Sequence, residues 1–257
     1  MSWQQILTAY KTITIKEILR FSRIWVQTIL PPAITMSLYF VIFGNLIGKA
    51  IGEMDGFKYI DYIVPGLIMM SVITNSYSNV VSSFFSSKMH GHVQELLISP
   101  TPNIVILLGF VTGGLARGLG VGIIVTLVAS FFTDLNIQHP FITLGVVFLT
   151  AFLFSIAGFI NAVYAKTFDA VNIIPVFILT PLTYLGGVFY SVNMLSPFWR
   201  DVSMFNPVLY MVNGFRYGIL GVSDISAVSS FALLLVFIAL LFGFALYLLN
   251  RGIGLRE

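Results

Sequence analysis

The stretch GNLIGKA, which runs from position 44 to position 50, is the first place where residue types suggest chemistry. Two glycines followed by a lysine can bind phosphate groups, but such a loop needs four residues between its glycines and a Ser or Thr directly after the lysine. Here three residues separate Gly44 from Gly48, and Ala50 follows Lys49. We therefore expect no nucleotide site in this stretch.

His90 and His92 are the second candidate, because two imidazoles close in sequence could ligate a metal ion. The chain has no cysteine, and Glu95 is the one further ligand type nearby. A solvated loop is the better interpretation, so we expect no metal site. No Ser/His/Asp arrangement or paired carboxylates can be assembled either, which indicates a chain that needs no cofactor and is not an enzyme by itself.

Arg117 stands out because it lies inside an otherwise apolar stretch. A charge within a membrane span is costly and usually faces a partner, a cavity or the protein interior. Two interpretations stay open: Arg117 is a packing feature that pairs with a carbonyl or snorkels, or it belongs to a transport path. The same stretch carries glycines at repeated small-x-x-x-small spacing, which lets helices approach closely. These are Gly109, Gly113, Gly114, Gly118 and Gly122.

The composition shows which kind of protein must position these residues. Of the 257 residues, 58% are hydrophobic and 9% are charged, whereas a soluble domain has about 25% charged residues. A net charge of +3 would suggest nucleic acid in a soluble protein, but here the basic residues flank apolar stretches. We therefore expect an all-α polytopic membrane protein that does not bind nucleic acid.

Six apolar segments are long enough for the roughly 20 residues that a bilayer core demands. They lie at 24–47, 59–84, 104–132, 141–164, 171–190 and 230–250. Before them, apolar residues of segment 1–23 recur at helical spacing while Lys16, Arg20 and Arg23 share another face, which predicts an amphipathic helix in the membrane interface. Asn172, two prolines and two glycines predict that the fifth segment kinks or unwinds.

Basic residues outside the spans predict the orientation. One side would carry Lys11, Lys16, Arg20, Arg23, Lys88, Lys166, Arg251 and Arg256, and the other would carry Lys49, Lys58, Arg200 and Arg216. Eight against four places both termini in the cytoplasm. Segment 191–229 has too short an apolar run to cross and contains Arg216, so we expect one or two short helices that dip back from the outer face.

The polar insert 86–103 is the longest one on the predicted cytoplasmic side, and it is the first candidate for contact with a soluble partner. Val93, Leu96 and Leu97 can form one apolar face of a short helix between Gly91 and Pro100. Glu95 would project beside that face toward basic groups of the partner. The alternative is a solvated loop that lies on the lipid headgroups.

With these elements in place, the chain resembles, over its whole length, the permease subunits of ABC type 2 transporters, and within them the YadH-like bacterial permeases. That family has an amphipathic amino-terminal helix, six spans, a cytoplasmic coupling segment after the second span and a re-entrant outer segment before the sixth. Its coupling motif is similar to Gly91, Glu95, Leu96, Ser99 and Pro100 here.

A second family motif is similar to Pro207, Val208, Leu209 and Tyr210 followed by Arg216, with Val208 departing from the Leu, Ile, Met or Phe expected there. The resemblance implies one ABC type 2 transmembrane domain over 1–257, with interfacial helix 1–23, a six-helix bundle 24–250 and a cytoplasmic tail 251–257. It also implies that the ATPase-coupling residues are Lys88, Gly91, Glu95, Leu96, Ser99 and Pro100.

The resemblance further implies a homodimeric or paired unit in the bacterial inner membrane, surrounded by lipids and bound to two copies of a separate ATP-binding cassette ATPase that drives export. Two other classes stay open. A membrane-embedded enzyme acting on lipid would use Asp61, Asn75 and Arg117 at a midplane site. A channel or secondary carrier would want more ionisable residues or inverted repeats inside the spans.

Overall fold

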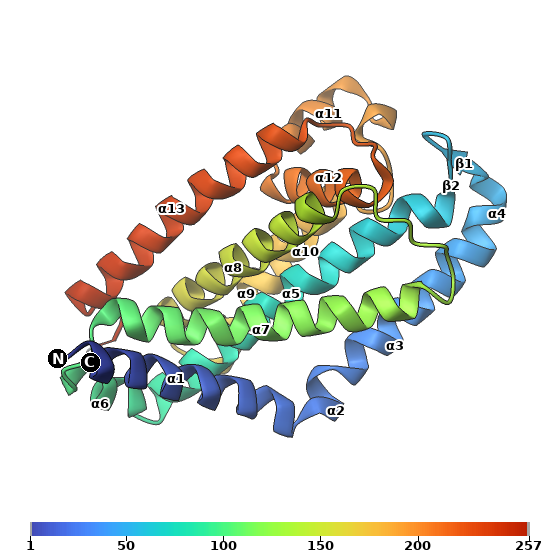
Figure 1. Cartoon of the computed structure of the whole chain (residues 1–257). Helices are drawn as coiled ribbons and strands as arrows, with labels where there is room; N and C mark the ends of the chain where they lie inside the picture. The colour runs from blue at the N-terminus through green and yellow to red at the C-terminus, as the bar shows by residue number, and fades with distance from the viewer. Residues whose placement is uncertain (1, 256–257) are drawn as a thin grey trace.

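The computed structural model describes residues 2–255. The last two residues of the predicted tail 251–257 lie outside the described part, and one of them is Arg256, which was counted among the basic residues. The described chain is nearly all helical (Figure 1). Its first half comprises α1 (Trp3–Arg23), α2 (Trp25–Thr28), α3 (Leu30–Tyr39), the π-helix η1 (Phe40–Ile47), α4 (Gly48–Ile51), β1 (Glu53–Met54), β2 (Phe57–Lys58), α5 (Tyr59–Met89), α6 (His92–Ile98) and α7 (Asn103–Ala129). Its second half comprises α8 (Pro140–Tyr164), α9 (Phe168–Ile174), the π-helix η2 (Pro175–Leu179), α10 (Thr180–Tyr184), the 3₁₀-helix η3 (Val192–Met194), α11 (Pro197–Met204), α12 (Pro207–Leu220) and α13 (Ala227–Arg251).

Four of these helical stretches are long and apolar enough to cross a membrane, by length and composition: Trp25–Ile51, Asn103–Ala129, Pro140–Tyr164 and Ala227–Arg251. The other two predicted segments take different forms. Helix α5 has 31 residues and is rich in Ser and Asn, and Phe168–Tyr184 is a shorter apolar helix.

Helix α5 can carry its polar residues because it lies at the centre of the bundle, with most of its residues buried. Two of the polar side chains find acceptors within the helix: Ser76 Oγ donates to Val72 O at 2.7 Å, and Asn75 Nδ2 donates to Ser71 O at 3.0 Å. Because other helices enclose it, α5 does not need the apolar surface that a lipid-facing helix needs.

Glycines on α7 let it pack closely and antiparallel against α5. A Cβ atom added at Gly114, Gly118 or Gly122 would overlap Val80, Ser76 or Val72 respectively. The three contacts step by four residues along both helices in opposite directions, which is the spacing of one helix face. The small-residue pattern of α7 is therefore a packing seam, as the sequence predicted.

Helix α8 also packs against α5 (Figure 1), and Gly158 lies at the contact. A Cβ atom at Gly158 would lie 2.5 Å from Tyr77 O and 3.2 Å from Tyr77 C, both backbone atoms of α5. This is a close approach between two backbones, which a side chain larger than hydrogen would prevent.

The structure corrects the all-α expectation at residues 53–58, where β1 and β2 form a two-stranded antiparallel hairpin. Asp55 and Gly56 form its turn with φ of +50° and +81°. Asp-Gly is a dipeptide that favours such a turn, so the sequence carried a signal for the hairpin between the first two predicted apolar segments. The 104–132 and 171–190 helices are also shorter than predicted, ending at Ala129 and Tyr184.

The fifth apolar segment is irregular, as predicted. Helix α9 changes into the π-helix η2 at Pro175, which has no N–H to donate within the helix. Thr180 Oγ1 donates to Pro175 O at 2.9 Å, so the carbonyl at the break finds a side-chain donor. Beyond α10, the chain leaves the helix and passes Gly187, whose φ is +68°.

Helix α1 packs lengthwise against α7, which the prediction of an amphipathic interfacial helix did not anticipate. Its buried stripe is Ile13, Glu17 and Phe21, spaced by four residues, whereas Trp3 is 77% exposed. Added Cβ atoms at Gly109 and Gly113 of α7 would overlap Ile13 and Glu17. The apolar residues of α1 are thus divided between the protein and its surroundings.

Candidate functional site

Residues 86–103 form a helical finger at the end of the bundle where both termini lie (Figure 1). Helix α5 ends at Met89, and Gly91 reverses the chain with a φ of +79°, a left-handed conformation that glycine adopts without strain. Helix α6 follows and ends at Ile98, after which Ser99 is extended and Pro100 prevents continuation. The short helix expected between Gly91 and Pro100 is therefore present.

The inward face of α6 holds the finger against its own bundle. Val93 is 1% exposed, and Leu96 and Leu97 pack against the core. Ser99 Oγ donates to Leu96 O at 2.6 Å, which satisfies a carbonyl in the last turn. The apolar face predicted for contact with a partner thus belongs mainly to the fold of this chain.

The outward face of α6 consists of His92, Glu95 and Ile98, spaced by three residues. The Glu95 side chain is 82% exposed, and His92 Nδ1 lies 3.9 Å from Glu95 Oε2. Ile98 is 85% exposed. This face presents a carboxylate beside an apolar side chain, and the sequence reasoning missed Ile98.

Two recesses flank α6. One, of about 500 Å³, is lined by Lys88, Gly91, Val93, Lys166 and Leu255 among others. The other, of about 690 Å³, lies between α6 and the first turns of α1, where Leu96 and Ser99 face Gln5 and Ala9. A partner that meets Glu95 and Ile98 would therefore also find concave surface on both sides.

Lys88, predicted to contact a partner, lies at the end of α5 and points into the bundle. Its Nζ donates to Val163 O at 2.7 Å and Ala165 O at 2.6 Å, and also reaches Ala162 O and Gly254 O at 3.1 and 3.4 Å. A cation among the last carbonyls of α8 is favourable because it complements the helix dipole. Lys88 fastens the finger to α8 and to the carboxyl-terminal turn.

The second motif lies at the opposite end of the bundle from α6, on α12. Pro207 is in the first turn, and Tyr210 donates through its hydroxyl to Met204 O at 3.0 Å. Arg216 is fully buried. Its Nη2 donates to Gly187 O at 2.6 Å, and its guanidinium lies 4.0 Å from the ring centroid of Tyr62 on α5.

Asp224, in the loop after α12, links the neighbouring segments through hydrogen bonds. The sequence analysis did not identify this residue. Its carboxylate accepts hydrogen bonds from Ser191 Oγ at 2.6 Å, from Val192 N at 3.1 Å and from Asn193 Nδ2 at 2.9 Å. The Asp224 N–H donates to Asn213 Oδ1 on α12 at 2.9 Å. These bonds and Arg216 hold α12 against α5 and the 187–193 loop.

Arg117 donates to Asn75 Oδ1 at 3.1 Å and to Thr28 O at 3.4 Å, so it joins α7 to α5 and to the start of the first apolar stretch. Asp61, grouped with these two residues in the lipid-enzyme alternative, instead accepts from Thr133. It lies about 21 Å from Asn75 along α5 at about 1.5 Å per residue. The structure therefore does not assemble that three-residue site.

Among the described residues, no group of three or more His, Asp or Glu side chains could hold a metal ion. The sequence reasoning also missed Glu17, a carboxylate fully buried on α1 beside Arg20. The KEILR spacing, an acid and a base three residues apart, was the available signal.

Comparison with known proteins gives a consistent result. The profile of the ABC-2 type transporter family matches residues 8–220. The inner membrane transport permease YadH of Escherichia coli (strain K12) is 56% identical over 250 residues, with 97% of each chain covered. Nodulation protein J of Neorhizobium galegae is 24% identical over 222 residues, with 83% of this chain and 82% of that protein covered. This chain belongs to the ABC-2 type transporter family.

Proposed function

We propose that this chain is the membrane-spanning permease subunit of a bacterial ATP-binding cassette exporter, and that α6 couples it to a separate ATPase chain. The relative at 56% identity is named an inner membrane transport permease, which supports the same role and membrane here. The observation that carries the coupling is the outward face of α6, where Glu95 and Ile98 are exposed at the end of a braced helical finger.

The finger is suited to transmit force because it is held on two sides. Lys88 links the end of α5 to α8 through hydrogen bonds, and the buried side chain of Val93 packs α6 against the core. A partner that pushes on Ile98 therefore acts on α5 and α7, the two long helices that the finger joins. Those helices pack along the glycine seam, so they would move as a pair.

Six spans follow if α5 and the stretch from Phe168 to Tyr184 cross the membrane together with the four apolar helices. Helix α5 is about 46 Å long, which exceeds a hydrocarbon core of about 30 Å. Both termini and α6 would then be cytoplasmic, and α11 and α12 would form a re-entrant segment on the outer side. Exposed apolar residues of the first stretch, including Trp25, Ile34 and Leu38, would meet lipid or a second copy in a homodimer.

Single cysteines test this topology cleanly, because the chain has none of its own. Gln4→Cys and Ile253→Cys should stay unlabelled by an impermeant maleimide in intact spheroplasts and react after lysis. Met194→Cys and Ser226→Cys, which flank α11 and α12, should both react in intact spheroplasts. All four positions are exposed, so accessibility reports the side of the membrane.

Labelling of position 4 or 253 in intact spheroplasts would show that the orientation is the reverse of the proposed one. Labelling of positions 194 and 226 from opposite sides would mean that α11 and α12 cross the membrane. Gly254 is avoided as a labelling site because its φ is +70°, and a side chain there would strain the backbone.

The partner itself is tested by photo-crosslinking in the native membrane. A benzoylphenylalanine at Ile98 should form an adduct with a chain that carries ATP-binding cassette motifs, identified by mass spectrometry. The matched control is Phe131, which is 86% exposed just beyond α7 at the opposite end of the bundle. The proposal fails if position 98 gives no such adduct, or if position 131 gives the same one.

A further inference from the structure

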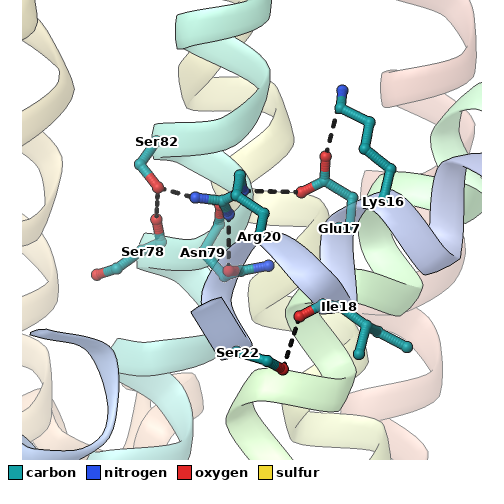
Figure 2. A network of polar contacts seen from close by, with 8 residues as sticks. All are labelled: Lys16, Glu17, Ile18, Arg20, Ser22, Ser78, Asn79 and Ser82. Atoms are coloured by element: carbon teal, nitrogen blue, oxygen red, sulfur yellow. Dashed lines mark hydrogen bonds and ion pairs between the residues drawn. The ribbon is translucent and has the colours of Figure 1, made fainter. Parts of the chain in front are cut away.

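An ion network centred on a buried carboxylate joins α1 to α5 (Figure 2). Glu17 of α1 is fully buried, and its two carboxylate oxygens meet Lys16 Nζ at 3.6 Å and Arg20 Nε at 3.3 Å. Arg20 then reaches α5, where its Nη2 donates to Asn79 O at 2.9 Å and to Asn79 Oδ1 at 2.8 Å. One guanidinium thus links a buried carboxylate on α1 to the central helix.

The position of Glu17 is set by α7. An added Cβ atom at Gly113 would overlap the Glu17 side chain, and four residues earlier one at Gly109 would lie 2.5 Å from Ile13 Cγ2. The two glycines form a groove in which α1 lies, and the groove brings Glu17 within reach of α5. A buried charge in such a place is costly unless it is paired, so packing alone does not explain why an acid occupies this position.

Two atoms of the network have no hydrogen-bond partner among the described residues: Glu17 Oε1 and Asn79 Nδ2. The first accepts hydrogen bonds and the second donates them. Buried polar atoms are rarely left unpaired. The network thus contains an acceptor on α1 and a donor on α5 that are not hydrogen-bonded in this arrangement of the helices.

We propose that Glu17, Arg20 and Asn79 form an ionic latch of positioning residues that makes α5 follow α1 when the cytoplasmic end of the permease is displaced. This inference rests on the proposed function, because the displacement comes from the ATPase. Helix α1 also lines the recess beside Leu96 and Ser99 of the α6 segment. A push at that end therefore reaches α1 as well as α5, and the latch keeps the two helices in step.

The test uses the complete permease–ATPase complex in nanodiscs, with Met194→Cys as an outer reporter. In the otherwise unchanged chain, trapping the ATPase with ATP and vanadate should change the rate of maleimide labelling by about fivefold or more. Glu17→Gln, which keeps the shape but removes the charge, should abolish that response while ATP turnover and the melting temperature are retained. Glu17→Asp, which keeps the charge, should restore part of the response.

Lys11→Gln is the matched control, because Lys11 is an exposed cation of the same helix. It should respond as the unchanged chain does. Should Glu17→Gln fail to fold, Arg20→Lys takes its place: lysine keeps the positive charge but lacks the planar fork that joins Glu17 to Asn79, and the response should again be lost.

A normal response in Glu17→Gln, or in Arg20→Lys where that variant is used, overturns the latch and leaves the proposed function standing. An absent response in the unchanged chain overturns ATP-driven coupling, and the latch with it. These two failures are distinguishable because the first appears only in the variants.

Discussion

Gly158→Leu is expected to separate α8 from α5 and to cause a large loss of stability. The added side chain would meet the backbone of Tyr77, at 2.5 Å from its carbonyl oxygen, and a helix backbone cannot move aside as a side chain can. Overpacking of this kind costs about 3 kcal/mol. For a chain of this size we expect the melting temperature in detergent to fall by roughly 10 °C.

Gly120→Leu is the matched control for that experiment. Gly120 lies on α7, and nothing lies within 4 Å of a Cβ atom added there. Leucine also favours the helix by about 1 kcal/mol relative to glycine, so Gly120→Leu should melt at or slightly above the temperature of the unchanged chain. Equal melting temperatures for the two variants would show that α5 and α8 are not packed as described.

Ile98→Asp is expected to release the ATPase from the permease while the permease itself stays folded. Ile98 is 85% exposed and does not support α6, whereas Val93 does. A central apolar contact is worth about 2 kcal/mol or more, or roughly thirtyfold in affinity. The ratio of ATPase to permease after affinity purification in mild detergent should fall accordingly, with an unchanged melting temperature.

Phe131→Asp, the same change at an equally exposed apolar position at the other end of the bundle, should leave that ratio unchanged. Glu95→Ala should have a smaller effect than Ile98→Asp, because exposed charges contribute about 1 kcal/mol or less. Leu96→Asp is less informative than either, since Leu96 packs against the core of this chain and its replacement would also loosen α6.

Local patterns along the chain predicted the elements whose cause is local. The helix between Gly91 and Pro100 was predicted from the glycine before it, its apolar face and the proline after it. The structure has α6 between the same residues. The irregular fifth segment followed from Pro175, where η2 begins. The seam on α7 followed from glycine spacing, which fixes one face of a helix wherever its partner lies.

Which side of each helix meets the rest of the protein could not be predicted in this way. Leu96 and Ile98 are both apolar and lie two positions apart, and only the packing of α6 turns the first inward and the second outward. Glu17 was not singled out from the sequence, and only the groove at Gly109 and Gly113 places it against α7. The sequence pattern of a helix alone does not show which of its side chains will be buried by tertiary packing.

Lys88 shows the same limit for a side chain with two plausible roles, whereas the outcome for Asp61 could have been predicted. A lysine beside a polar loop can contact a partner or cap a helix, and here the end of α8 supplies three carbonyls at 2.6 to 3.1 Å. Asp61 could have joined Asn75 and Arg117, but on a straight helix residues so far apart cannot meet. The first outcome depends on neighbouring elements, and the second follows from helix geometry.

ATP turnover by the reconstituted complex tests most directly whether α6 couples this permease to a separate ATPase. Turnover is measured for the ATPase alone and for its complexes with the unchanged chain, Ile98→Asp and Phe131→Asp. The account predicts that the unchanged chain and Phe131→Asp alter the turnover of the ATPase by about fivefold or more, and that Ile98→Asp leaves it at the value of the ATPase alone. Equal turnover with the unchanged chain and with Ile98→Asp would contradict coupling through α6.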